Sequence, residues 1–126
     1  MSEVRALIVD DSSVMRKIVE RSLRQAGLEP LAVLEAGSGV EGLEVLQTRK
    51  VDIIFSDINM PLMDGLEFVR QIHAQKLAEG VPVVMITTES SEEHVKQAIE
   101  AGAMGYIRKP FTADQVKRRV LPLLGA

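Results

Sequence analysis

The chain has 126 residues, which suits one domain able to bury about two thirds of the surface of its unfolded chain. It carries 15 Lys and Arg against 18 Asp and Glu, a net charge of −3, so nothing indicates the basic face that a nucleic-acid partner requires. Without Cys it can form neither disulfides nor thiolate metal sites, which fits a reducing compartment. No apolar run approaches the roughly 20 residues of a membrane span, and the first residues lack the pattern of a signal peptide, so we expect a cytoplasmic protein.

Short apolar runs recur along the chain and predict five strands buried on both faces. They cover residues 6–9, 31–34, 53–55, 83–86 and 106–107. The segments between and after them have helical spacing, which predicts five helices. Strict alternation of strands and helices is typical of a parallel sheet with helices on both faces, so we expect one doubly wound α/β domain over residues 1–126.

The predicted helices have recognisable ends and apolar faces. Ser12 or Ser13 should cap the first helix and Gly27 should end it. The last helix should stop at residues 120–121, because Pro122 lacks a backbone donor and crowds the preceding turn. The apolar faces are predicted to hold, in chain order, Val14, Ile18, Leu23 and Ala26; Val40, Leu43 and Leu46; Leu66, Val69 and Ile72; Val95, Ala98 and Ile99; and Val116, Val120 and Leu121.

Polar side chains stand at the ends of four of the five predicted strands. They are Asp10 and Asp11 for the first strand, Asp57 for the third, Thr87 for the fourth and Lys109 for the fifth. The second strand ends at residues 35–37, Glu-Ala-Gly, and offers no comparable polar group in this interpretation. If the strand order is 2-1-3-4-5, the four polar ends meet at the edge of the sheet where open α/β folds bind ligands.

Carboxylates gathered in one cleft repel one another unless a cation joins them. Lys109 would supply one positive charge and a divalent ion two, and an all-oxygen ligand set without Cys or a nearby His suits Mg²⁺. A carboxylate, Mg²⁺, a lysine and the Thr87 hydroxyl are together the parts used for phosphoryl transfer, with Asp57 as the nucleophile that forms an aspartyl phosphate. Each residue alone has an ordinary explanation, since an Asp after a strand more often caps a helix, but their convergence favours phosphoryl transfer.

The joint pattern resembles the receiver domain of two-component response regulators, over the whole chain. It consists of Asp10-Asp11, Asp57 followed by Met60-Pro61, Met63, Asp64 and Gly65, then Thr87, then Lys109-Pro110-Phe111. The similarity is closest to the stand-alone chemotaxis receivers of the CheY type. It implies a flavodoxin-like fold with strand order 2-1-3-4-5, an order known from that family and carried over from it. It also implies a phosphoacceptor switch, not an enzyme, with Mg²⁺-dependent self-phosphorylation and self-dephosphorylation.

The resemblance assigns a role to each site residue. Asp57 would accept a phosphoryl group from a phosphohistidine on a sensor histidine kinase. The implied magnesium ligands are Asp10, Asp11, Asp57 and the backbone carbonyl of Asn59. Thr87 and Lys109 would contact the phosphoryl group, and a cis peptide bond between Lys109 and Pro110 would turn the lysine back over the site.

The resemblance also implies how the phosphate lifetime and the switch are set. Asn59 and Glu89 occupy the positions that tune dephosphorylation in this family, and their polar pairing implies self-hydrolysis within seconds to minutes. Thr88 carries a methyl group more than the small residue common at its position, and this could narrow access to the phosphate. Tyr106 would turn into the space that Thr87 leaves when it moves toward the phosphate. Its ordinary alternative is a tyrosine half-buried at a sheet edge.

The implied output is binding to another protein. Expected partners are a chemotaxis-type histidine kinase, a downstream target for which the flagellar motor switch is one candidate, and a phosphatase; we expect a monomer that binds neither nucleic acid nor membrane. The surface that changes would lie on the fourth helix, fifth strand and fifth helix, with the candidates Lys96, Gln97, Tyr106, Arg108, Lys117 and Arg118, although charges there could equally form a solvated face. A receiver from a larger regulator or from a phosphorelay outside chemotaxis, including a phosphate sink, is the alternative.

Three competing functions are weaker. Residues 37–42 satisfy the G-x-G-x-x-G pattern of dinucleotide sites, but they follow the second strand and leave little chain for a substrate site. A phosphatase of the haloacid dehalogenase type needs D-x-D and a cap domain, whereas Asp10 and Asp11 are adjacent and no room for a cap exists. A degenerate receiver that binds constitutively is disfavoured because all five site positions are filled. His73 and His94 are expected at the surface, without a part in phosphotransfer.

Overall fold

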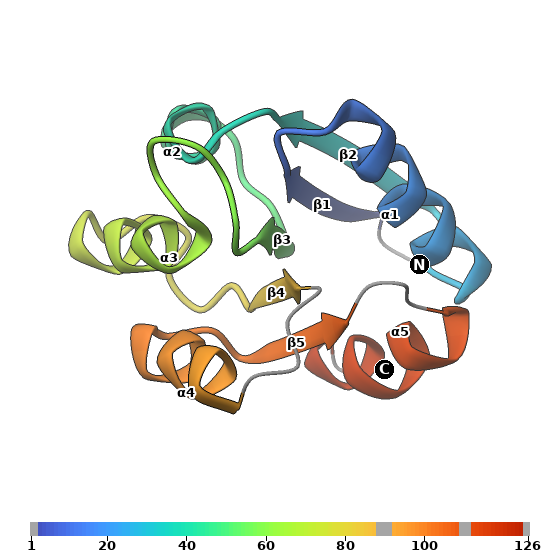
Figure 1. Ribbon diagram of the computed structural model, residues 1–126. Helices are drawn as coiled ribbons and strands as arrows, with labels where there is room; N and C mark the ends of the chain where they lie inside the picture. Colours follow the sequence, from blue (N-terminus) through green and yellow to red (C-terminus); the bar gives the residue numbers. More distant parts are fainter. Residues whose placement is uncertain (1–2, 88–91, 109–111, 125–126) are drawn as a thin grey trace.

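The computed structural model describes residues 3–87, 92–108 and 112–124, and these form a parallel sheet between two layers of helices (Figure 1). The strands are β1 (Val4–Val9), β2 (Leu31–Ala36), β3 (Ile53–Asp57), β4 (Val83–Thr87) and β5 (Gly105–Arg108). Their order is β2-β1-β3-β4-β5, and every neighbouring pair is parallel. The predicted fold class and strand order are confirmed.

Five α-helices alternate with the strands. They are α1 (Ser13–Gln25), α2 (Gly39–Thr48), α3 (Gly65–Ala74), α4 (Glu92–Ala101) and α5 (Ala113–Arg119), followed by the short 3-10 helix η1 (Leu121–Leu124). Helices α1 and α5 contact one another, while α3 contacts both α2 and α4, so two helices cover one face of the sheet and three the other (Figure 1). Within the described ranges, no helix combines the length and the apolar character needed to cross a membrane.

Each face of the sheet has its own hydrophobic core, because successive strand residues point to opposite faces. In β1, Leu7 and Val9 belong to the core beneath α2, α3 and α4, whereas Ala6 and Ile8 belong to the core beneath α1 and α5. The central strand β3 is buried along its whole length. Its acidic last residue, Asp57, is therefore held at the end of a rigid element.

The predicted helix ends agree with the structure. The Ser12 hydroxyl caps α1 by accepting a hydrogen bond from the backbone N–H of Met15 at 3.2 Å, and Gly27 follows the helix with a left-handed φ of 99°. Helix α5 ends at Arg119, and Pro122 lies within η1. The proline thus marks the change from α-helical to 3-10 geometry.

The predicted buried faces are partly wrong. Leu66, Val69 and Ile72 of α3 are buried as expected. On α1, however, Val14 and Ile18 are 67% and 40% exposed. Leu23 and Ala26 are buried as predicted, and Val19 and Ser22 complete the inward face in place of Val14 and Ile18. Val40 of α2 and Ile99 of α4 are likewise exposed. The side chain of Val95 lies outside the described part of the structure.

The glycine pattern at residues 37–42 serves helix packing. An added Cβ at Gly39 would lie 2.7 Å from the Met63 sulfur, and one at Gly42 would lie 2.8 Å from the Phe68 ring. Ser38 caps α2 by accepting a hydrogen bond from the N–H of Glu41 at 3.2 Å. These glycines let α2 approach the residues before and within α3, which explains the pattern without a nucleotide.

Candidate functional site

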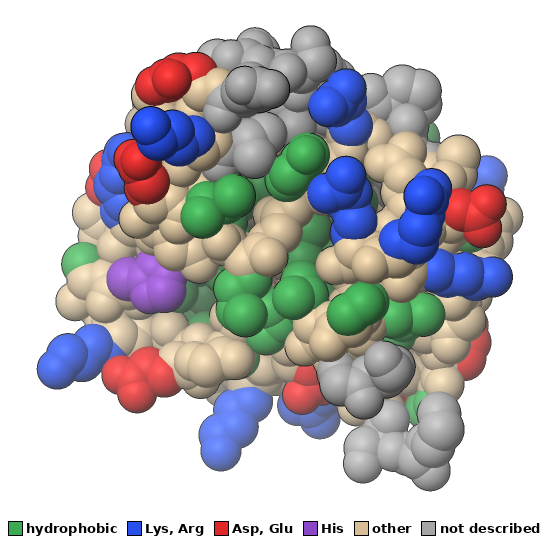
Figure 2. Space-filling view, turned by 90° about the horizontal axis from the view of Figure 1, so that it is seen from below, with side chains coloured by type: hydrophobic (Ala, Val, Ile, Leu, Met, Phe, Trp, Pro, Cys, Tyr) green, Lys and Arg blue, Asp and Glu red, His purple; other side chains and the backbone are tan. Residues whose placement is uncertain are grey.

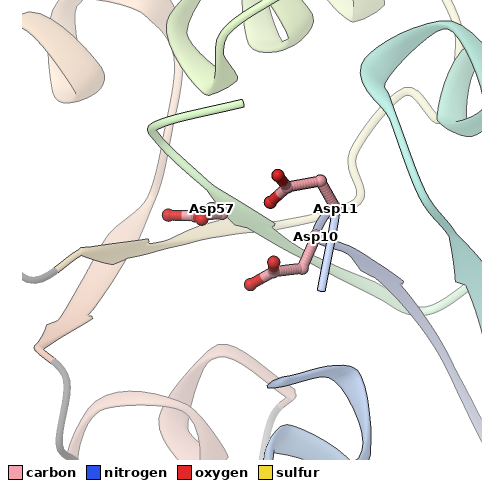
Figure 3. A group of neighbouring side chains, drawn as sticks. All are labelled: Asp10, Asp11 and Asp57. Atoms are coloured by element: carbon pink, nitrogen blue, oxygen red, sulfur yellow. The ribbon is translucent and has the colours of Figure 1, made fainter. Parts of the chain in front are cut away.

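Three carboxylates gather where β1 and β3 end. Asp10, Asp11 and Asp57 each offer one carboxylate oxygen, and these oxygens all lie within 4.8 Å of one another. Figure 3 shows the three side chains projecting from the strand ends toward the same space. Asp10 is 1% exposed, Asp57 is 9% exposed and Asp11 is open to solvent. The predicted convergence of the acids is therefore present, although they come from segments nearly 50 residues apart.

Asp10 is fixed by hydrogen bonds on its backbone and on its side chain. Its N–H donates to the carbonyl of Ala36 in β2 at 3.1 Å, and its own carbonyl accepts from Arg16 Nη1 at 2.6 Å. Its carboxylate Oδ1 accepts from the N–H of Ser12 at 2.9 Å. Burial without a partner would be costly for a carboxylate, and these bonds keep the buried acid in place.

The turn after β3 is built on a glycine. The N–H of Gly65 donates to the carbonyl of Ile58 at 2.7 Å, so the start of α3 folds back on the strand end. An added Cβ at Gly65 would clash with the carbonyl oxygen of Asp57. Asp64 caps α3 by accepting from the N–H of Glu67 at 2.8 Å. Asp64 and Gly65 therefore serve the geometry of the turn that presents Asp57.

Asn59 lies beside the candidate phosphoacceptor. Its backbone N–H donates to Asp57 Oδ1 across 3.4 Å, a long hydrogen bond, and its side chain is exposed. The part predicted for the backbone carbonyl of Asn59 as a magnesium ligand stays a prediction.

The fourth and fifth strand ends adjoin the cluster through the sheet register. Asp57 pairs with Ile86 of β4, and the next residue, Thr87, pairs with Arg108 of β5. The side chain of Thr87 lies outside the described residues, as do Thr88, Glu89, Lys109 and Pro110. The roles predicted for these residues, including the cis peptide bond, stay predictions.

Tyr106 lies on β5, half-buried, with the guanidinium carbon of Arg119 4.6 Å from the ring centroid. This is the half-buried sheet-edge environment described above as the ordinary alternative, and it agrees equally with a switch residue. The ring lines a hollow together with Arg108, Gln115 and Arg118. Figure 2 looks onto this side of the molecule and shows Lys and Arg side chains gathered where α5 lies, next to exposed hydrophobic side chains.

Sequence reasoning missed two residues that adjoin the site. Arg16 donates to the Asp10 carbonyl and, through Nε, to Glu35 Oε1 at 2.9 Å. Glu35, near the end of β2, lies outside the acidic cluster, as the sequence indicated, but it is linked to Asp10 through Arg16. Partial burial acts to raise the pKa of Glu35, but hydrogen bonds from Arg16 and Lys17 outweigh it and hold the pKa below its ordinary value. The sequence shows only that an Arg follows Ser12 by one helical turn and that a Glu stands near the end of the second strand; that the two meet is seen in the structure.

The acidic cluster fits a hard divalent cation. Three carboxylate oxygens in close reach, with no nitrogen or sulfur donor among them, form the kind of ligand set that Mg²⁺ prefers. Without a cation, the buried carboxylates of Asp10 and Asp57 and the exposed carboxylate of Asp11 would repel one another. The cluster could therefore hold a metal ion through Asp10, Asp11 and Asp57.

Comparison with known proteins places the chain in a family. Residues 6–121 match the family described as the response regulator receiver domain. The chain belongs to the response regulator receiver family. Receiver domains of this family act as signalling switches in two-component systems.

Individual relatives place this receiver with CheY proteins. The chemotaxis protein CheY homolog of Campylobacter jejuni is 41% identical over 123 residues, covering 97% of this chain and 93% of the relative. The structure of the chemotaxis response regulator CheY4 of Vibrio cholerae has a TM-score of 0.81 at 36% identity, covering 93% of this chain and 95% of that one. The receiver domain of the sensor histidine kinase PA1611 of Pseudomonas aeruginosa, solved with a magnesium ion coordinated in its active-site cleft, has a TM-score of 0.84 at 25% identity, covering 99% of this chain and all of the other. The receiver is therefore CheY-like in sequence and in fold.

Proposed function

We propose that this receiver accepts a phosphoryl group on Asp57 from a phosphohistidine of a sensor kinase, with Mg²⁺ bound at the acidic cluster. The observation that carries the proposal is the approach of Asp57 to Asp10 and Asp11, whose carboxylate oxygens lie within 4.8 Å of one another. Charges of one sign are brought this close at a cost in free energy, and a bound cation offsets that cost. The magnesium ion described for the PA1611 receiver belongs to a protein of the same fold and supports the same assignment here.

The transfer step is a displacement at phosphorus. A carboxylate oxygen of Asp57 attacks, the new O–P bond forms, and the N–P bond of the phosphohistidine breaks with its electron pair left on the imidazole nitrogen. Bound Mg²⁺ would neutralise negative charge on the phosphoryl oxygens. Thr87 and Lys109 are the proposed donors to the remaining oxygens, and Asp10 and Asp11, with the Asn59 carbonyl, are the proposed ligands beside Asp57.

Dephosphorylation would return the phosphorylated protein to its unphosphorylated form without the kinase. A water molecule attacks phosphorus, the bond to the Asp57 oxygen breaks, and inorganic phosphate leaves. We propose that the side chain of Asn59, whose backbone N–H adjoins the Asp57 carboxylate, orients such a water molecule. Glu89 and Thr88 are the other residues that we propose to set the rate, the first as a polar neighbour and the second by narrowing the approach.

The proposed output surface comprises α4, β5 and α5. Movement of the Thr87 hydroxyl toward a phosphoryl group would vacate space for Tyr106, whose ring is half-buried at this surface. Exposed side chains around it include Lys96, Arg108, Lys117 and Arg118, with Gln97 partly exposed. We propose that partners recognise this surface, and that the ring position reports the phosphorylation state to them.

Chemotaxis is the proposed pathway, because the relatives at about 40% identity are chemotaxis proteins. On this basis the proposed partners are a chemotaxis-type histidine kinase, a downstream target such as the flagellar motor switch, and a phosphatase. The PA1611 receiver belongs to a sensor histidine kinase, so the same fold also occurs within larger proteins. A part in another phosphorelay, as a receiver module or a phosphate sink, is therefore the second candidate.

The direct test of phosphorylation is incubation with acetyl phosphate followed by intact-mass measurement, with and without Mg²⁺. We expect one added phosphoryl group that requires Mg²⁺ and is absent from the Asp57→Asn variant. Asp52→Asn is a matched control, since Asp52 is an exposed acid before β3 that accepts a hydrogen bond from the N–H of Arg5 at 2.8 Å, away from the cluster. Uptake that persists in Asp57→Asn, or that ignores Mg²⁺, would refute the proposal.

A further inference from the structure

Arg16 connects the acidic cluster to an ion pair outside it. Its Nη1 donates to the backbone carbonyl of Asp10 at 2.6 Å, and its Nε donates to Glu35 Oε1 at 2.9 Å. The Arg16 side chain is only 17% exposed, so solvent weakens these contacts little. Because the guanidinium group is planar and its donors are fixed relative to one another, the position of Glu35 sets the direction of the N–H that reaches Asp10.

The carbonyl that Arg16 contacts belongs to the peptide group joining Asp10 to Asp11. The N–H of Asp10 is held by the carbonyl of Ala36 at 3.1 Å, so the backbone is restrained on both sides of the Asp10 Cα. Fixing this peptide plane limits rotation toward Asp11 as well. The orientation of this peptide therefore sets the direction in which the exposed Asp11 side chain projects. Asp10 and Asp11 can share a metal ion only if their carboxylates point toward the same position.

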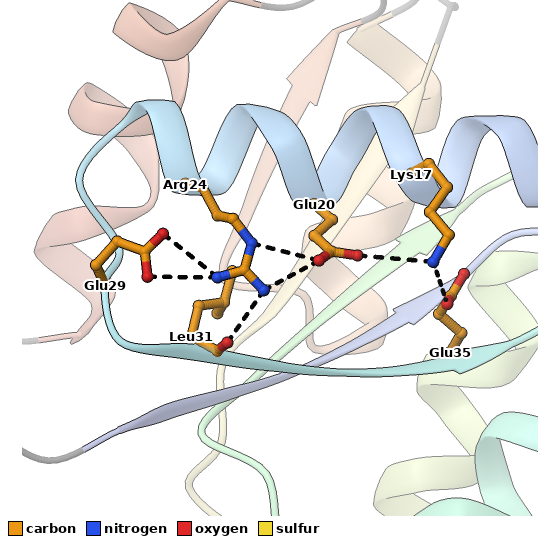
Figure 4. A network of polar contacts seen from close by, with 6 residues as sticks. All are labelled: Lys17, Glu20, Arg24, Glu29, Leu31 and Glu35. Carbon is orange, nitrogen blue, oxygen red and sulfur yellow. Dashed lines mark hydrogen bonds and ion pairs between the residues drawn. The ribbon is translucent and has the colours of Figure 1, made fainter.

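Glu35 is itself held firmly. Its other oxygen accepts a hydrogen bond from Lys17 Nζ at 3.1 Å (Figure 4), and its backbone, near the end of β2, pairs in register with Ile8 of β1. Two cations of α1 thus hold one carboxylate of β2. Through Arg16 this arrangement ties α1, β1 and β2 together at the peptide that carries the acid pair.

We propose that Arg16, held by Glu35, is a positioning residue that sets the geometry of the Asp10–Asp11 pair for a divalent cation. The inference rests on the proposed function, which assigns the pair to metal binding. Without Arg16 all three carboxylates remain, but the peptide between Asp10 and Asp11 turns more freely. Outer contacts of this kind change metal affinity by roughly 10- to 100-fold when removed, and we expect roughly a 10-fold loss here.

Whether Mg²⁺ affinity rises or falls when Arg16 is replaced distinguishes a positioning role of Arg16 from a purely electrostatic one. Arg16→Gln removes a positive charge beside the acids, so electrostatics alone would make Mg²⁺ bind more tightly. Loss of positioning makes it bind more weakly. Arg16→Lys keeps the charge but lacks the planar fork, so it should also bind Mg²⁺ more weakly than the wild-type protein does.

The chain contains a matched control on the same helix. Arg24 also joins a carboxylate to a backbone carbonyl of β2: its Nη2 donates to Glu20 Oε2 at 3.0 Å and to the Leu31 carbonyl at 3.2 Å (Figure 4). Leu31 is the first residue of β2, at the opposite end of the strand from the cluster. Arg24→Gln therefore removes comparable contacts from α1 without touching the acid pair.

The experiment is calorimetric titration of Mg²⁺ into the wild-type protein and the variants Arg16→Gln, Arg16→Lys, Glu35→Gln and Arg24→Gln, together with Arg16→Gln/Glu35→Gln. Circular dichroism checks that each is folded, and Arg16→Lys, which keeps the charge, tests the same link should Arg16→Gln fail to fold. We expect roughly 10-fold weaker binding in Arg16→Gln, a smaller loss in Glu35→Gln, no further loss in the double variant, and no change in Arg24→Gln.

Several results would overturn the inference. Unchanged or tighter Mg²⁺ binding in Arg16→Gln, full affinity in Arg16→Lys, or an equal loss in Arg24→Gln each contradicts positioning by Arg16. If the wild-type protein itself neither binds Mg²⁺ nor takes up a phosphoryl group on Asp57, the proposed function fails and this inference fails with it. If the wild-type protein does both while Arg16→Gln keeps its affinity, only the inference on Arg16 fails.

Discussion

Gly65 stands where the first turn of α3 meets the end of β3, and the fit leaves no room for a side chain. An added Cβ would clash with the Asp57 carbonyl oxygen and would lie 2.8 Å from the Cα of Ile58. Both obstacles are backbone atoms, which cannot move aside without shifting the strand end. A glycine here is therefore required for Asp57 to be presented on a tight turn.

We expect Gly65→Ala to destabilise the protein by about 1–3 kcal/mol, because overpacking forces the backbone apart. Gly39→Ala is the control: its Cβ would meet the side chain of Met63, which is flexible and can move. Urea unfolding followed by circular dichroism measures both. Equal stabilities of the two variants would show that the turn after β3 is looser than described.

Leu62 lies in the loop between β3 and α3 with a left-handed backbone, φ 69°, and its side chain is fully exposed. A leucine with this φ is strained by its Cβ, and here it gains no burial in return. We expect Leu62→Gly to raise the free energy of unfolding by about 0.5–1 kcal/mol, since relief of strain exceeds the added chain entropy. Leu62→Ala retains the Cβ and should leave stability unchanged in the same urea experiment; a gain equal to that of glycine would speak against backbone strain.

At the scale of elements, the strands could be predicted more reliably than the helix faces. A short apolar run between turn residues is typical of a buried strand in an α/β protein, and all five predicted strands agree with the structure to within two residues at each end. On α1 the apolar residues support two faces. The inward one includes Ser22, which a polarity pattern places outside, and this error left Val14 and Ile18 on the wrong side.

The contacts of long charged side chains escape prediction for a different reason. That Arg16 reaches both Glu35 and the Asp10 carbonyl depends on the rotation of α1 and on the register of β2 against β1. Neither quantity follows from the order of residues in the chain. The strand-end acids, by contrast, meet wherever parallel strands share an edge, and for that reason their grouping could be foreseen.

The lowered pKa of Glu35 predicts that the stability contributed by its ion pairs with Arg16 and Lys17, which connect α1 to β2, depends on pH. A glutamate with a lowered pKa stabilises the fold above its unfolded pKa of about 4.3, and that stabilisation is lost as the pH falls through the folded pKa. We expect Glu35→Gln to cost about 0.5–1 kcal/mol at neutral pH, and the difference from the wild-type protein to shrink below about pH 4.3.

Urea unfolding at neutral and acid pH tests this, with Glu44→Gln as control. Glu44 is an exposed glutamate of α2, and no ion pair to it is found among residues 3–87, 92–108 and 112–124. Its substitution should change stability little at either pH. A difference between Glu35→Gln and the wild-type protein that stays constant across the acid range would exclude the ion pair as its source.

For the whole molecule, the acidic cluster makes stability depend on the cation. Asp11 is an exposed acid whose carboxylate adjoins two others, so its charge opposes folding when no cation is present. We expect Asp11→Asn to be as stable as the wild-type protein, or more stable, in EDTA. Millimolar Mg²⁺ should then raise the melting temperature of the wild-type protein well above its value in EDTA, with little rise in the variant.

Thermal unfolding by circular dichroism, with and without Mg²⁺, makes this comparison in a single experiment. Asp52→Asn should behave as the wild-type protein does, because Asp52 precedes β3 at the other end of the strand. If Mg²⁺ raises the melting temperature of Asp11→Asn as much as that of the wild-type protein, the ion binds elsewhere.

Phosphoryl transfer to Asp57 requires one arrangement: acids, a hydroxyl and an ammonium group from four strand ends around a single oxygen of Asp57. The most direct measurement is a crystal structure of the protein with Mg²⁺ and beryllofluoride, which mimics an aspartyl phosphate. We predict beryllium bonded to a carboxylate oxygen of Asp57, Mg²⁺ held at Asp10, Asp11, Asp57 and the Asn59 carbonyl, and Thr87 and Lys109 in contact with the fluorides. Beryllofluoride on another residue, or Lys109 directed away from it, would contradict the account.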